Sequence, residues 1–230
     1  RDKIERLFDY FSRYENEYGL LEDLPGWVFV EWSDCSKFLT PVNIPTNMLY
    51  ARALADAADL YGVDAWKAKS DAIKSTIRGT AFNGKFFEDN LVRENGKLVR
   101  AGNVTETCQY YAFFTGVASK SDYPALFSTM LTSFGPLRGS DVYPDIPRSN
   151  AFIGNFLRLE MLDLYGEEDA ILREFTPYFD RMTRRTGTLW ENNDPQASCC
   201  HGFASYICVL YAKIAFGYLG FDETNRSVLL

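Results

Sequence analysis

Apolar residues recur at three- and four-residue steps along most of this chain, which is the spacing of one face of an α-helix. Two stretches show it clearly: Ile4, Leu7, Phe8, Phe11 and Tyr14, then Leu49, Ala53, Leu54, Ala57 and Leu60. Further helices are predicted over residues 64–82, 105–117, 123–134, 150–165, 168–184 and 198–219, which brings the number to eight. Long and short connections alternate between them, so we expect stacked or circularly arranged helical hairpins.

Local signals punctuate this helical pattern. N-caps are expected at Thr46, Ser149 and Ser198, and helix ends at Gly62, Gly166 and Gly220. Asn95-Gly96 lies between two short alternating runs, which predicts a small β-hairpin near residues 85–100. Because 230 residues can bury one substantial core, we expect a single domain over residues 1–230.

Charge and composition restrict the possible partners. The chain has 24 basic and 31 acidic residues, a formal charge of −7, and its lysines and arginines do not cluster with interleaved aromatics. Nucleic acid and anionic membranes are therefore disfavoured as partners. No run of about 18 apolar residues is present that could span a bilayer. A neutral ligand is the better expectation, and the sequence assigns no compartment.

The cysteines point to no special chemistry. Five cysteines form an odd set without a regular framework, so we expect them to be reduced. In Cys199-Cys200-His201, three consecutive side chains cannot easily converge on one tetrahedral ion, so we expect no metal. The sequence shows no phosphate-binding Gly-rich loop, Ser-His-Asp arrangement or dinucleotide fingerprint, and no cofactor is expected.

One carboxylate stands beside an indole near the carboxyl end, at Trp190-Glu191, shortly before the only histidine, His201. An acid next to an aromatic ring suits a pyranose, because the sugar's C–H groups can lie on the ring face while the carboxylate activates water. Glu191 is therefore the leading catalytic candidate. The bland alternative is that the acid is solvated and the ring fills the core.

A second candidate segment is the long, proline-bounded connection over residues 24–45. Long loops in compact domains are often functional, and this one carries Trp27, Glu31, Trp32 and Asp34. We expect it to face Glu191 across a space the size of a monosaccharide. The residues expected to line that cavity are Glu191, His201, Glu31, Trp32 and Trp190.

Five features together resemble the catalytic domain of the α-L-rhamnosidases, the family 78 glycoside hydrolases. They are Gly26-Trp-Val-Phe-Val-Glu-Trp32, the helix that opens after Thr46, Thr105-Glu-Thr-Cys-Gln109, Thr188-Leu-Trp-Glu191 and Ser198-Cys-Cys-His201-Gly-Phe-Ala204. The resemblance implies an all-α fold, an (α/α)6 toroid of twelve helices that is incomplete in this chain. It also implies inverting hydrolysis of terminal α-L-rhamnose or a related deoxy sugar, without a cofactor or metal.

The resemblance also implies roles for single residues. Glu191 matches the general base, which takes a proton from the attacking water, and His201 matches a histidine that contacts the bound sugar. Trp190 and Trp32 match aromatic positions near the pocket, and Glu31 falls where many members carry aspartate. Trp27, in the same segment, joins them as a substrate-binding candidate. Asn192-Asn-Asp194 stands where the family commonly has another tryptophan, and Cys200-His201 stands where Asn-His is usual.

Inversion needs a second carboxyl group about 6.5–9.5 Å from the first. The family's general acid lies in an upstream acidic motif, and nothing before Glu31 resembles it. Residues 1–8 already follow a helical pattern, so we expect the chain to be the later portion of a larger enzyme. Three explanations stay open: the acid lies on sequence outside this chain, it is replaced by Glu31, Asp34 or Glu106, or the protein no longer catalyses.

The expected partners are a rhamnose-containing glycan or glycoside and the remaining part of the parent polypeptide. Two alternative functions stay open. One is another (α/α)-toroid glycosidase or a polysaccharide lyase, which would give an unsaturated product. The other is a non-catalytic helical-hairpin interaction scaffold, with its acids and tryptophans spread over a concave surface.

Overall fold

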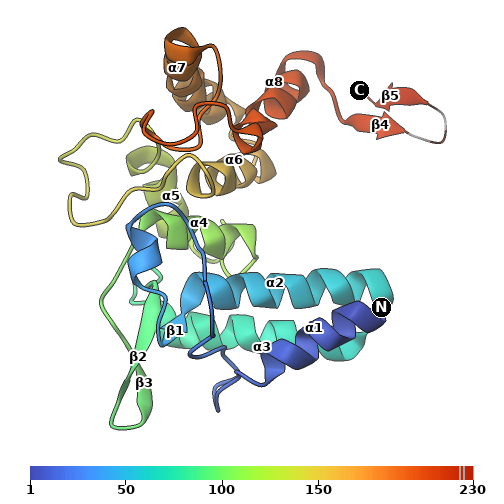
Figure 1. Ribbon diagram of the computed structural model, residues 1–230, viewed down its shortest axis with the longest axis vertical. Helices are drawn as coiled ribbons and strands as arrows, with labels where there is room; N and C mark the ends of the chain where they lie inside the picture. The colour runs from blue at the N-terminus through green and yellow to red at the C-terminus, as the bar shows by residue number, and fades with distance from the viewer. Residues whose placement is uncertain (223, 225, 230) are drawn as a thin grey trace.

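The computed structural model describes residues 1–222, 224 and 226–229, and within them eight α-helices form a curved stack (Figure 1). The helices are α1 (Asp2–Ser12), α2 (Ile44–Tyr61), α3 (Asp64–Ala81), α4 (Glu106–Phe114), α5 (Pro124–Ser133), α6 (Gly154–Leu164), α7 (Glu168–Thr186) and α8 (Tyr206–Phe216). Two short 3-10 helices, η1 (Asp34–Lys37) and η2 (Gly202–Ser205), interrupt the first and last long connections. The chain is thus mostly helical, as the sequence predicts.

The even-numbered helices form a central row. Helix α2 packs on α4, α4 on α6, and α6 on α8, while α3 covers α2 and α7 covers α6. In Figure 1 the stack runs from α1–α3 through α4 and α5 to α6–α8 and curves into an open C. Each helix of the row is entered through a long connection and left through a short one, as the sequence pattern predicts.

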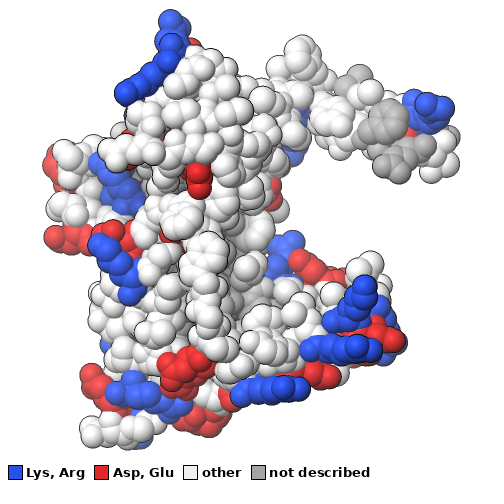
Figure 2. Space-filling model, viewed as in Figure 1, with Lys and Arg blue, Asp and Glu red and all other residues white. Residues whose placement is uncertain are grey.

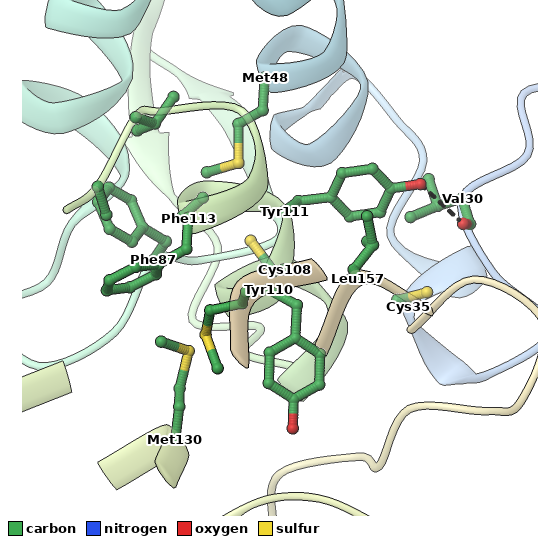
Figure 3. Packing of buried hydrophobic residues seen from close by; sticks show 14 of the residues in the cluster. Val30, Cys35, Met48, Phe87, Cys108, Tyr110, Tyr111, Phe113, Met130 and Leu157 are labelled. Atoms are coloured by element: carbon green, nitrogen blue, oxygen red, sulfur yellow. Dashed lines mark hydrogen bonds between the residues drawn. The ribbon is translucent and has the colours of Figure 1, made fainter. Parts of the chain in front are cut away.

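The core is densest around α4, whose residues from Glu106 to Phe113 are all buried. Met48 of α2, Met130 of α5 and Leu157 of α6 approach this helix from different sides (Figure 3). Helix α4 shows no polar face because neighbours cover it all round. The Tyr111 hydroxyl donates to the backbone carbonyl of Val30 at 3.2 Å, which fastens the first long connection to the core.

Several helix ends differ from the sequence-based expectation. The N-cap of α2 is Asn43, whose side-chain oxygen accepts the Thr46 N–H at 2.9 Å, so the expected cap Thr46 lies inside the helix. Helices α6 and α8 begin at Gly154 and Tyr206, well after the expected caps Ser149 and Ser198. Gly62 ends α2 as expected.

The carboxyl end of α8 also departs from expectation. Gly217, in the left-handed conformation at φ 68°, ends this helix. Gly220, expected to end it, is instead the first residue of β4 (Gly220–Asp222), which pairs with β5 (Ser227–Leu229).

The expected hairpin is present as β2 (Asn90–Glu94) and β3 (Lys97–Arg100). Asn95 and Gly96 form its turn with φ of 50° and 79°, the left-handed backbone that a two-residue turn of this kind needs. A further short strand, β1 (Val42–Asn43), pairs antiparallel with β2 and makes a three-stranded sheet. The sequence pattern does not predict β1, because this strand is only two residues long and leads directly into α2.

Charged side chains are unevenly spread over the surface. Figure 2 shows them gathered over the α1–α3 end, whereas the face over the first and last long connections is mostly uncharged. Among the described residues, no helix is both long and apolar enough to cross a membrane.

Candidate active site

The long connections meet at one end of the central row, on the left in Figure 1. Backbone hydrogen bonds join them in sequence. The Ile44 N–H at the start of α2 donates to the Asp89 carbonyl at 2.8 Å, and the Glu106 N–H at the start of α4 donates to the Pro147 carbonyl at 3.1 Å. This end therefore collects side chains from distant parts of the chain.

Glu191 lies on the last of these connections, in a loop that folds back on itself. Its N–H donates to the Ser198 carbonyl at 2.9 Å, and the His201 N–H donates to the Leu189 carbonyl at 2.9 Å. The carboxylate is half-buried, and none of the described residues forms a hydrogen bond or an ion pair with it. Such a carboxylate has its oxygens available to water or to a ligand.

His201 is the N-cap of η2, where its Nδ1 accepts the Phe203 N–H at 3.3 Å. That bond makes Nδ1 an acceptor and leaves Nε2 as the nitrogen that carries the proton in the neutral ring. The ring is half-buried and packs edge-on against Phe152, with centroids 5.0 Å apart. It thus joins the α7–α8 connection to the α5–α6 connection.

A continuous run of aromatic rings links the first long connection to His201. Trp27 contacts Phe29 at 5.4 Å and Trp32 at 6.1 Å, and Phe29 contacts Phe152 at 5.8 Å between ring centroids. Trp27 is 78% exposed and Trp32 is 45% exposed. The early tryptophan-rich segment and the late acid-bearing loop therefore lie on the same side of the molecule.

Glu31 lies beneath this surface and is fully buried. Its carboxylate accepts backbone N–H groups from four residues: Trp32, Asn150, Ile153 and Gly154. Burial raises the pKa of Glu31, and the donated N–H groups oppose that rise. The carboxylate also delays the start of α6 by holding residues 150–153 in a non-helical turn, which is why Ser149 is not its cap.

Trp190 is also buried, with 1% of its surface exposed. Its Nε1 donates to the Thr186 hydroxyl at 2.7 Å, and the guanidinium groups of Arg181 and Arg185 lie 5.5 and 5.7 Å from the ring centre. The expectation of one cavity lined by five residues thus differs from what is found: Glu191, His201 and Trp32 are at the surface, while Glu31 and Trp190 support it from below.

The three acids considered as partners of Glu191 differ in access. Glu106 is buried, where it pairs with Arg138 at 3.1 Å and accepts the N–H of Ser149 at 3.1 Å. Glu31 is buried as described. Asp34 is exposed, with Lys37 at 2.8 Å. Only Asp34 of the three meets solvent in this conformation.

Sequence reasoning missed two residues at this site, Asn150 and Phe152. Asn150 donates to the Trp32 carbonyl and to the Asn192 side chain, both at 2.6 Å, and Phe203 packs on Phe152 at 4.9 Å. The sequence offers no signal for Asn150 and Phe152, because they belong to an irregular segment and their partners are remote in the chain. Predicted as the start of a helix, residues 150–153 are in fact a turn.

The site is open at the surface. A cavity of about 200 Å³ lies beside it, lined by Leu24, Val28, Phe29, Val30, Pro45, Thr46, Leu49 and Tyr111. A larger one of about 800 Å³ lies between α5 and α7, and neither Glu191 nor His201 is among its lining residues. Within the described part of the chain, no group of three or more His, Cys, Asp or Glu side chains is arranged to hold a metal ion.

These features define a helical-hairpin fold with an acid and exposed aromatics at the loop end. In fold the chain is similar to the crystal structure of a GH78 family rhamnosidase of Bacillus sp. GL1, with a TM-score of 0.75 and 18% sequence identity. The similarity covers 96% of this chain and 24% of that protein, so the chain spans about a quarter of its length. No protein-family model matches the sequence, and comparison with curated proteins finds no match.

Proposed function

We propose that the chain is part of the catalytic domain of an inverting glycoside hydrolase that removes terminal α-L-rhamnose or a related deoxy sugar. In this proposal the central row is one arc of an (α/α)6 toroid, and the substrate binds at its loop end. Similarity in fold to a rhamnosidase supports the enzyme class. The observation that carries the proposal is the unpaired, half-buried carboxylate of Glu191 on the same surface as exposed indoles.

The proposed mechanism gives Glu191 the role of general base. Its free carboxylate takes a proton from a water molecule as that water attacks the anomeric carbon, while a second carboxyl group protonates the leaving oxygen. In this proposal the second carboxyl group belongs to the remaining part of the parent polypeptide, because Glu31 and Glu106 are buried and Asp34 is ion-paired with Lys37 at 2.8 Å.

The exposed rings supply the proposed sugar-binding surface. Trp27 and Trp32 offer faces on which the C–H groups of a pyranose can lie. In the neutral ring of His201, Nδ1 accepts the Phe203 N–H, so Nε2 is the nitrogen that can donate to a sugar hydroxyl. Glu31 and Trp190 act in this proposal by supporting the binding segments from beneath.

The test is hydrolysis of an aryl α-L-rhamnoside by this chain and by the chain joined to its parent polypeptide. Glu191→Gln keeps the size of the side chain and removes the base, so turnover should fall by roughly 10²–10⁴. Asp194→Asn is the matched control, since the exposed Asp194 lies in the same loop and its Oδ1 can still accept the Gln196 N–H.

Near-normal turnover in Glu191→Gln would remove Glu191 as the base. An unsaturated, ultraviolet-absorbing product would identify a lyase instead. If neither form of the protein binds or cleaves rhamnosides, the interaction scaffold is favoured.

A further inference from the structure

Asn150 uses all of its side-chain hydrogen-bonding capacity at the junction of three connections. Its Nδ2 donates to the Trp32 carbonyl at 2.6 Å and to Asn192 Oδ1 at 2.6 Å. Its Oδ1 accepts the backbone N–H of Asn193 at 2.7 Å and that of Ala151 at 2.8 Å. One half-buried amide therefore holds the segment before η1, the turn before α6, and the loop that carries Glu191.

Asn193 reinforces this junction from the other side. Its Nδ2 donates to the Ser149 carbonyl at 3.1 Å, and its side-chain oxygen accepts the Tyr178 hydroxyl. Arg181 of α7 donates to the Asn193 carbonyl at 2.7 Å. The residues that directly follow Glu191 are thus fixed to α7 and to the Ser149-Asn150 turn, while the Glu191 carboxylate itself stays unpaired.

We propose that Asn150 is a positioning residue that sets the Glu191 loop against the Trp32 segment. Only a short primary amide fits the pattern, because the site needs two donated and two accepted bonds from one planar group. Aspartate would place an oxygen against two acceptors, and glutamine would be longer by one methylene. The consequence for turnover rests on the proposed function, whereas the joining of the loops is testable alone.

The first experiment compares amide hydrogen exchange in Asn150→Asp and in the parent chain. Loss of the two donated bonds should speed exchange by about tenfold in the peptides that contain Trp32 and Glu191, the factor that corresponds to about 1.4 kcal/mol. Peptides of α2 and α3 should be unchanged. Faster exchange confined to residues 149–155 would overturn the proposal.

The pH dependence of this variant separates positioning from simple loosening. Once protonated, the introduced carboxyl group can again donate one bond, either to the Trp32 carbonyl or to Asn192. After correction for the intrinsic pH dependence of amide exchange, protection of one of the two peptides should therefore partly return as the pH falls through the pKa of that group. Asn103→Asp is the matched control, because Asn103 Nδ2 donates to Asn90 Oδ1 at 2.9 Å in the hairpin region. Asn103→Asp should speed amide exchange in residues 88–105 alone. The same exchange pattern in Asn103→Asp and Asn150→Asp would contradict the positioning role of Asn150.

A second variant covers the case in which Asn150→Asp does not fold. Asn192→Ala removes one accepting oxygen and leaves the Asn150–Trp32 bond, so exchange should rise in the Glu191 peptide and stay unchanged in the Trp32 peptide. An unchanged Glu191 peptide would contradict the proposal.

Turnover of an aryl α-L-rhamnoside then tests the catalytic link. It should fall further in Asn150→Asp than in Asn103→Asp at equal folded fraction. Loosened loops with parental turnover would refute the positioning of a base. Inactivity of the parent would count against the proposed function only, since the exchange data still decide whether Asn150 joins the loops.

Discussion

The Glu31 carboxylate accepts the backbone N–H of Ile153 at 3.2 Å, although 122 positions separate the two residues. The same carboxylate holds the N–H groups of Asn150 and Gly154. A buried acid from the tryptophan-rich segment thus occupies the amino end of α6, where free N–H groups and the helix dipole favour negative charge. The placement of Trp32 therefore depends on a helix more than a hundred residues later.

Gly154→Ala should disrupt the contact between the Glu31 carboxylate and the amino end of α6. A Cβ at Gly154 would lie 2.7 Å from Glu31 Oε2 and would also collide with Ser149 Cβ. We expect a loss of about 1–3 kcal/mol in the free energy of unfolding, as for other overpacked sites. Gly79→Ala is the control, because nothing lies within 4 Å of its Cβ in α3, and it should stabilise by about 0.5–1 kcal/mol. Equal effects in urea titrations would contradict the packing argument.

Asp89 should make stability depend on pH. It is buried against the Thr105 N–H and hydroxyl, both at 2.7 Å, and burial raises its pKa to about 7. The unfolded side chain titrates near pH 4, so between about pH 4 and 7 the folded state binds more protons and stability falls as pH rises. Asp89→Asn should flatten this slope in urea unfolding at several pH values.

The exposed Asp194→Asn serves as the comparison for that measurement and should keep the parental slope. A parental slope in Asp89→Asn as well would show that other groups cause the pH dependence.

Trp27→Ala should separate binding from folding. Because Trp27 is 78% exposed, its removal should change the free energy of unfolding by no more than about 0.5 kcal/mol. Rhamnoside binding, followed by isothermal titration calorimetry, should weaken. Trp190→Ala, in contrast, should act on folding. It removes a buried side chain and should lower the free energy of unfolding by about 3–5 kcal/mol. Unaltered binding in a folded Trp27→Ala protein would exclude that indole from the sugar surface.

The Arg158–Glu174 pair should be one of the most sensitive positions in the helical stack. Arg158 Nε and Nη2 donate to the two Glu174 oxygens at 2.8 and 3.0 Å, with the guanidinium fully buried. Glu174→Gln leaves a buried positive charge without its partner, which should cost about 3–5 kcal/mol in thermal or urea unfolding. Asp180→Asn removes the partner of Arg184 in an exposed pair and should have little effect.

Local patterns account for the features that the sequence predicts well. Asn95-Gly96 specifies its own backbone conformation, so the hairpin appears where expected. The helices follow from apolar spacing, and their number within the described residues agrees. The described helices form an arc, and the complete (α/α)6 toroid is part of the proposed function.

Long-range contacts account for the features that the sequence does not predict. Serine is a common N-cap residue, so Ser149 is the expected cap of α6. The Glu31 carboxylate, from a distant segment, instead accepts the N–H of Ile153 at the start of this helix. Trp190 stands next to Glu191 in the sequence, but in an irregular loop no periodicity tells which of the two faces solvent. The arginines of α7 cover the indole, and the carboxylate is left uncovered.

The short connections, such as the turn at Gly62, leave the central row at the end away from Glu191. Natural variation can therefore act separately on the two ends of the molecule. Under the proposed function, exchanges of exposed residues in the long connections, such as Trp27, alter the sugar-binding surface while the contacts between the helices of the central row are kept. Under the same proposal, exchanges at the opposite turns act on the stability of the fold, because these turns lie away from Glu191.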